Sequence, residues 1–397
     1  MKHPRMKHDQ LAGMWTRHAA EWRDTAQVSS QWREAADTDP RLLESRATKG
    51  WWPTLQQLGI TLFVTREYEH LVLALTGAPS GRNRTSFFPM PHPSGLAVDR
   101  QARTVYIAST RNPNQVYSFQ PLSSLLDRTD VKVPRDGETP LMPSSAVYYP
   151  GSLYIHDLAL LATGRLYANA VGHNAVVRLL DGNRFEYVWW PNCIVVKGAP
   201  VFSRNHIQLN SIAAGRTLAQ SFFSASSDRM GRLRPGHLNY PVDGRGVIFS
   251  GATGEPVCTG LTRPHSARLR NKQLWVDNSG YGEVGIVADG RLQVVRKLPG
   301  WTRGLCIVED IAFVGTSRII PKFARYAPGL DASSSVCGIH AISCKTGELL
   351  GSLEWPYGNQ IFSIDWIPSS ITTGFPFAVP LRKSTRETVL FYSYLNS

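Results

Sequence analysis

The chain has 397 residues, 42% hydrophobic and 18% charged, and its 43 Lys and Arg against 30 Asp and Glu give a formal net charge of +13. This much apolar surface excludes an intrinsically disordered protein, and the lack of a sustained triplet or heptad excludes collagen and coiled coil. A basic surface favours anionic partners, but it does not separate substrates from nucleic acids or membranes.

Targeting and redox signals predict a cytoplasmic protein. The basic segment Met1–Lys7 leads into polar residues rather than an apolar core, so it predicts no secretory signal. No run of about 18 apolar residues predicts a membrane helix. The five cysteines show no CxxC spacing, which favours free, buried thiols over disulfides or a zinc knuckle.

Residues 1–50 differ in pattern from the rest of the chain. Positions 11, 14, 15, 18 and 22, apolar except for His18, have helical spacing, and a second helical stretch covers about 28–37, where Asp39-Pro40 ends it. We expect a helical N-terminal extension that packs on, or bridges from, a main domain at residues 51–397.

From residue 60 onward, short β-rich segments alternate with Gly, Pro, Asn and Ser turns. A degenerate unit recurs: a polar residue, a small residue, a short apolar strand, a tight turn and a second strand. Copies begin near residues 93, 155, 209, 264, 302 and 361. Periods of about 40–60 residues with this content are typical of β-propellers. The sequence predicts an all-β, six-bladed propeller, closed by pairing strands near 60–75 with the C-terminal strand at 387–395.

The first side chain of each innermost strand should point at the central channel of such a ring. These residues are Ser94, His156, Asn210, His265, Arg303 and Phe362. Imidazole and amide oxygen are ligands for divalent metals, so His156, His265 and Asn210 form a predicted metal site, with Asp157 orienting a ligand. The alternative is that both histidines only bond backbone carbonyls and water.

Arg303 is a second candidate, because a guanidinium at a channel mouth can hold a carboxylate or phosphate bidentately. The alternative is a salt bridge to Asp157 or Asp365. With His156 and His265, Arg303 and His92 complete the predicted catalytic set, His92 as a proton-transfer group.

Three further residues are predicted to bind substrate. Asn278 lies in an Asn-Ser-Gly-Tyr-Gly segment that is also typical of a turn, Asn169 ends a predicted strand, and His173 lies in a predicted loop. For each of them a structural role is the alternative.

These motifs resemble a bacterial family of β-propeller-like proteins, TIGR03032 or DUF4915. The similarity spans about 60–370 and includes His92-Pro-Ser-Gly-Leu-Ala-Val, Ile155-His-Asp-Leu-Ala, Pro264-His-Ser and Pro299-Gly-Trp-Thr-Arg-Gly-Leu. Where the family tends to have His-Leu-Asn, this chain reads Gln208-Leu209-Asn210, with a histidine displaced to 206. The resemblance implies a propeller fold and says little of activity.

Two classes of function follow. The first is a metal-dependent enzyme, of hydrolase, lyase or epimerase type, acting on a small anionic substrate at the axis. The second is a non-catalytic binding or scaffold propeller that recruits an acidic partner, with the N-terminal helices available for a protein partner or homo-oligomer. No motif indicates specific nucleic-acid binding or a membrane.

Overall fold

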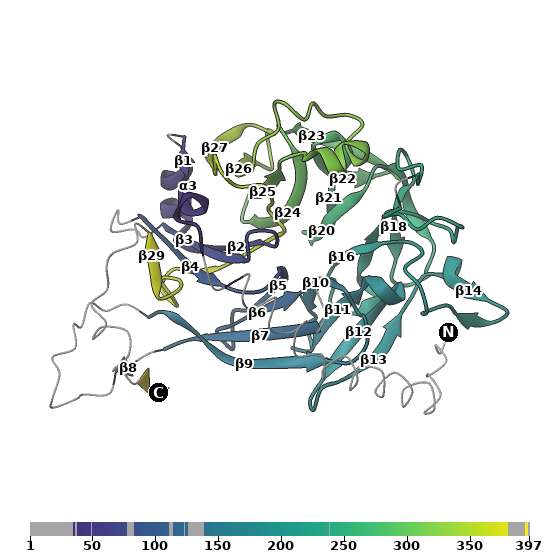
Figure 1. The fold of residues 1–397 in the computed structure, drawn as a ribbon, viewed down its shortest axis with the longest axis horizontal. Coiled ribbons are helices and arrows are strands. Elements are labelled where there is room, and N and C mark those ends of the chain that lie inside the picture. Colours follow the sequence, from purple (N-terminus) through teal and green to yellow (C-terminus); the bar gives the residue numbers. More distant parts are fainter. Residues whose placement is uncertain are drawn as a thin grey trace.

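The computed structural model describes residues 35, 38–48, 50–77, 83–110, 114–122, 124–125, 139–237, 239–379 and 394–395. Six antiparallel β-sheets, the blades, stand around a central axis (Figure 1). The first strands of neighbouring blades contact one another around the whole ring. The prediction of an all-β, six-bladed propeller is confirmed.

The blades repeat one order of strands from the axis outward. Three of them are β5 (Pro93–Asp99), β6 (Thr104–Ser109), β7 (Asn114–Pro121) and β9 (Leu141–Tyr149); β10 (Ile155–Leu160), β11 (Leu166–Ala170), β12 (Ala175–Leu180) and β13 (Arg184–Trp189); β16 (Leu209–Ala213), β17 (Phe222–Ala225), β18 (Gly246–Ser250) and β19 (Pro256–Leu261). The others are β20 (Pro264–Arg270), β21 (Gln273–Asn278), β22 (Glu283–Ala288) and β23 (Arg291–Lys297); β24 (Trp301–Val308), β25 (Ile311–Ser317), β26 (Gly338–Ser343), β27 (Leu349–Glu354) and β1 (Arg46–Ala47); β28 (Ser363–Pro368), β2 (Ile60–Arg66), β3 (Leu71–Gly77), β4 (Asn83–Pro89) and β29 (Phe377–Val379).

The closing blade joins strands from both ends of the chain. Its inner strand β28 pairs with β2 from Ile60↔Pro368 to Thr65↔Ser363. Of the predicted closing strand at 387–395, only β30 (Tyr394–Leu395) lies within the described residues, and it pairs with β8 (Ser124–Leu125). Mixed strands in one sheet close the ring and cover edges that would otherwise be open.

The predicted helical extension is not confirmed. Residues 1–34 lie outside the described residues, and so do 36–37 of the second predicted helix. After them, η1 (Pro40–Leu43) is a 3-10 turn in which the Asp39 side chain accepts the backbone N–H of Arg41. Then α3 (Trp51–Leu58) is an α-helix that ends at Gly59 in the left-handed region. Proline at the start of η1 begins a turn here, because it needs no N–H donor at that position.

Apolar side chains fill the spaces between blades. Strands β2 and β3 are buried along their whole length, as expected for strands covered on both faces. Trp51 and Trp189 are fully or almost fully buried, and Trp51 packs edge-on to Phe313 at 5.9 Å. Within the described residues, no helix is long and apolar enough to cross a membrane. Further short elements are η2 (Val171–His173), η3 (Asn192–Ile194), the β14 (Val195–Val196) and β15 (Ala199–Pro200) pair, η4 (Leu218–Gln220), η5 (Ser279–Tyr281) and η6 (Pro321–Tyr326).

Candidate functional site

A β-bulge interrupts five of the six inner strands near the same point of the repeat. The register of the strand pairing shifts once in each of these strands. The five shifts lie at Pro93/Leu96, Ile155/Leu158, Leu209/Ser211, His265/Arg268 and Thr302/Leu305. A bulge re-aims side chains and is common beside active sites. We call this end of the inner strands, where the bulges lie, the head end.

Six side chains clamp each blade to the head of the next. Each donates a hydrogen bond to a backbone carbonyl of the following blade: Thr65 to Ser94, Ser94 to Ile155, Asn169 to Leu209, Asn210 to Pro264, Ser279 to Thr302, and Ser317 to Ile361. These bonds run once around the ring. Ser94 and Asn210, which the sequence placed at the channel, therefore carry structural bonds between blades.

His156 and His265 lie together at the head end. Their ring centroids are 6.5 Å apart and nearly parallel, and both side chains are largely buried. Phe362 stands edge-on to His156 at 5.4 Å, and Tyr154 lies 4.7 Å from the same ring. Residues from three blades thus meet at one point although they are distant in the sequence.

Arg303 reaches the same cluster from β24. Its guanidinium carbon lies 3.4 Å from the centroid of the Phe362 ring, a cation–π contact. The side chain is half-buried, and it makes no hydrogen bond or ion pair with any residue that the structure describes. The predicted salt bridge is not formed, because Asp157 pairs with Arg268 and Asp365 pairs with Arg100.

Arg263, which the sequence did not single out, adds a second guanidinium. It is buried, stacks on Tyr326 at 4.2 Å and donates one hydrogen bond to the Pro235 carbonyl. Burial, with a smaller contribution from the Arg303 charge, lowers the pKa of Arg263 to about 10. Burial, followed by the Arg303 charge, also holds the pKa of His265 well below its usual range. The neighbourhood of His265 is therefore electropositive.

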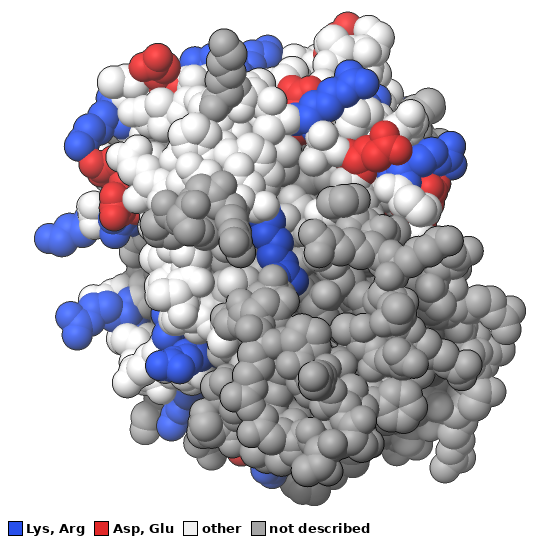
Figure 2. Space-filling view, turned by 90° about the vertical axis from the view of Figure 1, so that its left-hand side faces the viewer, with Lys and Arg blue, Asp and Glu red and all other residues white. Residues whose placement is uncertain are grey.

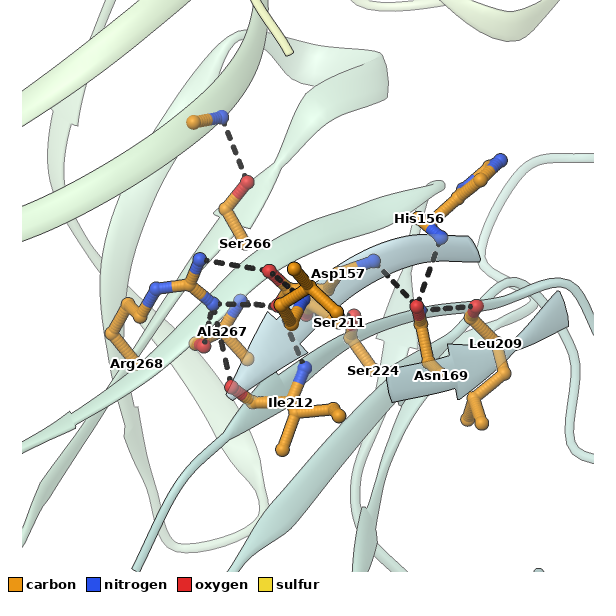
Figure 3. A network of polar contacts seen from close by, with 12 residues as sticks. His156, Asp157, Asn169, Leu209, Ser211, Ile212, Ser224, Ser266, Ala267 and Arg268 are labelled. Atoms are coloured by element: carbon orange, nitrogen blue, oxygen red, sulfur yellow. Dashed lines mark hydrogen bonds and ion pairs between the residues drawn. The ribbon is translucent and has the colours of Figure 1, made fainter. Parts of the chain in front are cut away.

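Asp157 does not line the head end. It forms an ion pair with Arg268 one position further along the inner strand than His156. Arg268 of β20 donates to both carboxylate oxygens at 2.8 and 3.2 Å, and the backbone N–H of Ile212 donates at 3.0 Å (Figure 3). Burial raises the pKa of the Asp157 carboxyl, and the Arg268 guanidinium opposes that rise. The pair ties three inner strands together directly behind His156.

Asn169 also supports His156 rather than facing the axis. Its side-chain oxygen accepts the backbone N–H groups of His156 and Asp157, and its amide nitrogen donates to Leu209 (Figure 3). Asn278 is engaged on both atoms too: it accepts from the N–H of Thr262 and donates to Glu283. These contacts match the structural alternatives for both asparagines.

The two other predicted histidines lie outside the His156–His265 pair. His173 bonds through Nδ1 to the Tyr187 hydroxyl at 2.7 Å, against the outermost strand of its blade. His92 lies 3.8 Å from the buried carboxylate of Glu67, which also accepts the Thr110 hydroxyl at 2.8 Å. Burial lowers the pKa of Arg303, and the negative charge of Glu67 is the largest contribution that raises it again. The His92–Glu67 pair therefore acts electrostatically on the cluster of Arg303, His156 and His265.

The donors at the head end suit a divalent metal poorly. Two imidazoles are close, and the side-chain oxygen of Asn210 is buried without a partner among the described residues. Yet no three His, Cys, Asp or Glu side chains in the described part of the chain gather as metal ligands. Two guanidiniums beside His265 would repel a cation. The metal stays a prediction.

One backbone feature of the head end is invisible in the sequence. The residue two positions before four of the channel residues has a positive φ: His92 (42°), Tyr154 (55°), Gln208 (52°) and Arg263 (54°). Few non-glycine residues adopt this region. The repeat of this strained position would have drawn attention to Arg263 and Tyr154, had the backbone been known.

Comparisons with known proteins agree with the fold. A family model described as "Domain of unknown function (DUF4915)" matches residues 49–374. A search of curated proteins found no match. Among solved structures, a chain of the nidogen/laminin complex is similar at 10% identity, with a TM-score of 0.50, over 78% of this chain and 98% of that one.

Two further structures are similar at lower scores. A Bacteroides caccae protein of unknown function has 8% identity and a TM-score of 0.47 over 78% of this chain and 99% of that one. A gluconolactonase from Xanthomonas campestris has 13% identity and a TM-score of 0.45 over 75% of this chain and 86% of that one. Likeness at this level concerns the fold alone and carries no argument about activity.

Proposed function

Since the chain belongs to the DUF4915 family and folds as a six-bladed propeller, we propose that it is an enzyme of hydrolase, lyase or epimerase type that acts on a small anionic molecule at the head end. One observation carries the proposal. The Arg303 guanidinium stands at the meeting point of the inner strands without an ion-pair partner in the described chain. A half-buried cation without a direct ion pair is costly unless a ligand supplies the anion.

The neighbours of Arg303 give this anion site its chemistry. A guanidinium binds carboxylate or phosphate through parallel N–H donors, and Arg263 adds a second positive charge nearby. His156 and His265 lie beside it with rings close enough to contact one substrate. In this proposal they move a proton to or from the bound molecule, and the His92–Glu67 pair exchanges protons behind them.

Binding of probe anions tests the first half of the proposal. Acetate, succinate and inorganic phosphate are titrated into the protein by calorimetry, and the best probe is repeated with Arg303→Met. We expect the variant to lose at least about tenfold in affinity, since a charge-assisted pair contributes about 1.5 kcal/mol or more. Arg178→Met is the matched control, because Arg178 pairs with Glu186 at 2.6 Å on outer strands. Equal binding by wild type and Arg303→Met would contradict the proposal.

The catalytic half is tested with molecules that carry the best anionic group. Turnover is followed by nuclear magnetic resonance for wild type and for His156→Gln and His265→Gln. We expect both variants to keep binding and lose turnover, because glutamine retains hydrogen bonds but cannot take up a proton. Full turnover by both variants would leave an anion-binding protein without the proposed proton transfer.

A metal-dependent form of the reaction has one supporting observation, the buried side-chain oxygen of Asn210, which has no hydrogen-bond partner among the described residues. Elemental analysis of the purified protein decides it: stoichiometric metal that disappears in a His156→Ala, His265→Ala double variant would support it.

A scaffold role for an acidic partner is the other alternative. On the described part of the face in Figure 2, Lys and Arg lie in separate groups, some beside Asp and Glu, rather than in one patch.

A further inference from the structure

A cavity of about 370 Å³ lies at the opposite end of the axis from His156 and His265. All six inner strands line it, through residues that follow the channel residues along each strand: 96–98, 100, 158–160, 212, 214, 268–270, 306–307 and 365–366. We call this cavity the tail cavity. It shares none of the residues that form the proposed anion site at the head end.

The size and walls of the tail cavity suit a small organic ligand. Its volume lies within the range of about 300–1,000 Å³ that is usual for ligand pockets. Twelve of the sixteen lining residues are apolar, among them Leu96, Leu158, Ile212 and Ile307, so the walls favour an apolar body. The other four are charged, and they decide what kind of polar group the ligand carries.

The charged groups are held in place by their own contacts. Arg100 donates to Asp365 at 2.6 Å and lies 4.2 Å from the centroid of the Trp366 indole. Arg268 is held by the Asp157 carboxylate behind the wall. Groups that are fixed before a ligand arrives lose little entropy when it binds.

Arg270 breaks the balance of charge at the tail cavity. Its guanidinium donates to the Glu309 carbonyl at 3.3 Å and forms no ion pair with the described residues. The guanidiniums at the cavity are those of Arg100, Arg268 and Arg270. The carboxylates are that of Asp365 and that of Asp157, which pairs with Arg268 behind the wall, so one positive charge is left over. Charge complementarity calls for a ligand with one negative charge.

We propose that the tail cavity binds a small monoanion with an apolar body, of the aromatic or branched short-chain carboxylate class. The carboxylate lies against Arg270 at the cavity wall, and the hydrocarbon part fills the space between the inner strands. The site is independent of the proposed activity at the head end, because the two ends have no residue in common.

Benzoate is the probe, and benzamide is its neutral isostere. Calorimetry is run on the full chain with Arg270→Met, with Ala214→Leu, which fills part of the cavity, and with two controls, Arg303→Met and Arg291→Met on the outer strand β23. We expect saturable benzoate binding to wild type, with benzamide and Arg270→Met each at least about fivefold weaker, as the loss of a partly exposed ion pair implies. Ala214→Leu should abolish the component of benzoate binding that Arg270→Met weakens. Arg291→Met should leave all binding unchanged, and Arg303→Met should leave that component unchanged.

Two results would overturn the proposal: no saturable benzoate binding to wild type, or binding that Arg303→Met removes and Ala214→Leu keeps, which would place the ligand at the head end. Circular dichroism checks that Ala214→Leu is folded. A crystal soaked with 4-bromobenzoate decides independently of any variant, because the anomalous bromine signal lies either between Leu158 and Arg270 or elsewhere.

Discussion

The ion pair between Asp157 and Arg268 allows a quantitative test of how the centre of the ring is held together. Arg268→Met removes the guanidinium and leaves a carboxylate that is 4% exposed with only backbone donors. At an effective dielectric constant near 20, two charges about 4 Å apart attract by about 4 kcal/mol. Breaking a buried pair costs about 3–5 kcal/mol, and we expect the lower end because the Arg268 side chain is 21% exposed.

Urea unfolding followed by tryptophan fluorescence measures this cost. Arg268→Met should lower the free energy of unfolding by about 3 kcal/mol with an unchanged m-value. Asp157→Asn should cost less, since the arginine that it leaves can reach water. The double variant should lose at least about 1.5 kcal/mol less than the sum of the two single losses, because no buried charge is then left alone. Additive effects, or a loss below about 0.5 kcal/mol for Arg268→Met, would refute the reasoning.

Further predictions concern stability and need the same unfolding assay. Burial lowers the pKa of His340 from its usual 6.5 to about 4. The unfolded chain therefore binds this proton first as the pH falls, and stability should drop by up to about 3 kcal/mol between pH 6.5 and 4; a His340→Gln variant that drops equally would disprove this. Gly95→Ala should cost about 1–3 kcal/mol, because a Cβ would lie 2.6 Å from the Asp157 Cα; wild-type stability would contradict it. Trp51→Ala should cost about 3–5 kcal/mol, as for other fully buried tryptophans. Arg303→Met should leave the ligand-free protein as stable as wild type or up to about 1 kcal/mol more stable, because it removes a half-buried cation that forms no ion pair with the described residues; a clear loss of stability would show that Arg303 has a structural role instead.

The repeat in the sequence was enough to predict the ring and four of the residues that meet at its centre, His156, His265, Arg303 and Phe362. Each copy is one blade that cannot bury its faces alone, so its period and its polar first residue recur in every copy and are visible without a structure. This is why His156, His265 and Arg303 were found although 147 positions separate the first from the last. Ring closure by β28 was harder to predict, because pairing between chain ends leaves no local signal.

What the sequence determined by itself is the fold class and the meeting of His156, His265, Arg303 and Phe362 at the head end, because both depend on local periodicity. Only the tertiary structure added Arg263 and Tyr154 to that cluster. Which carboxylate neutralises which arginine was decided only in three dimensions. Asp157 pairs with Arg268, 111 positions away, and Asp365 pairs with Arg100, so neither neutralises Arg303, which has no ion pair with the described residues. Ion pairing depends on distances of a few ångströms between strands of different blades, and no spacing along one chain encodes those distances.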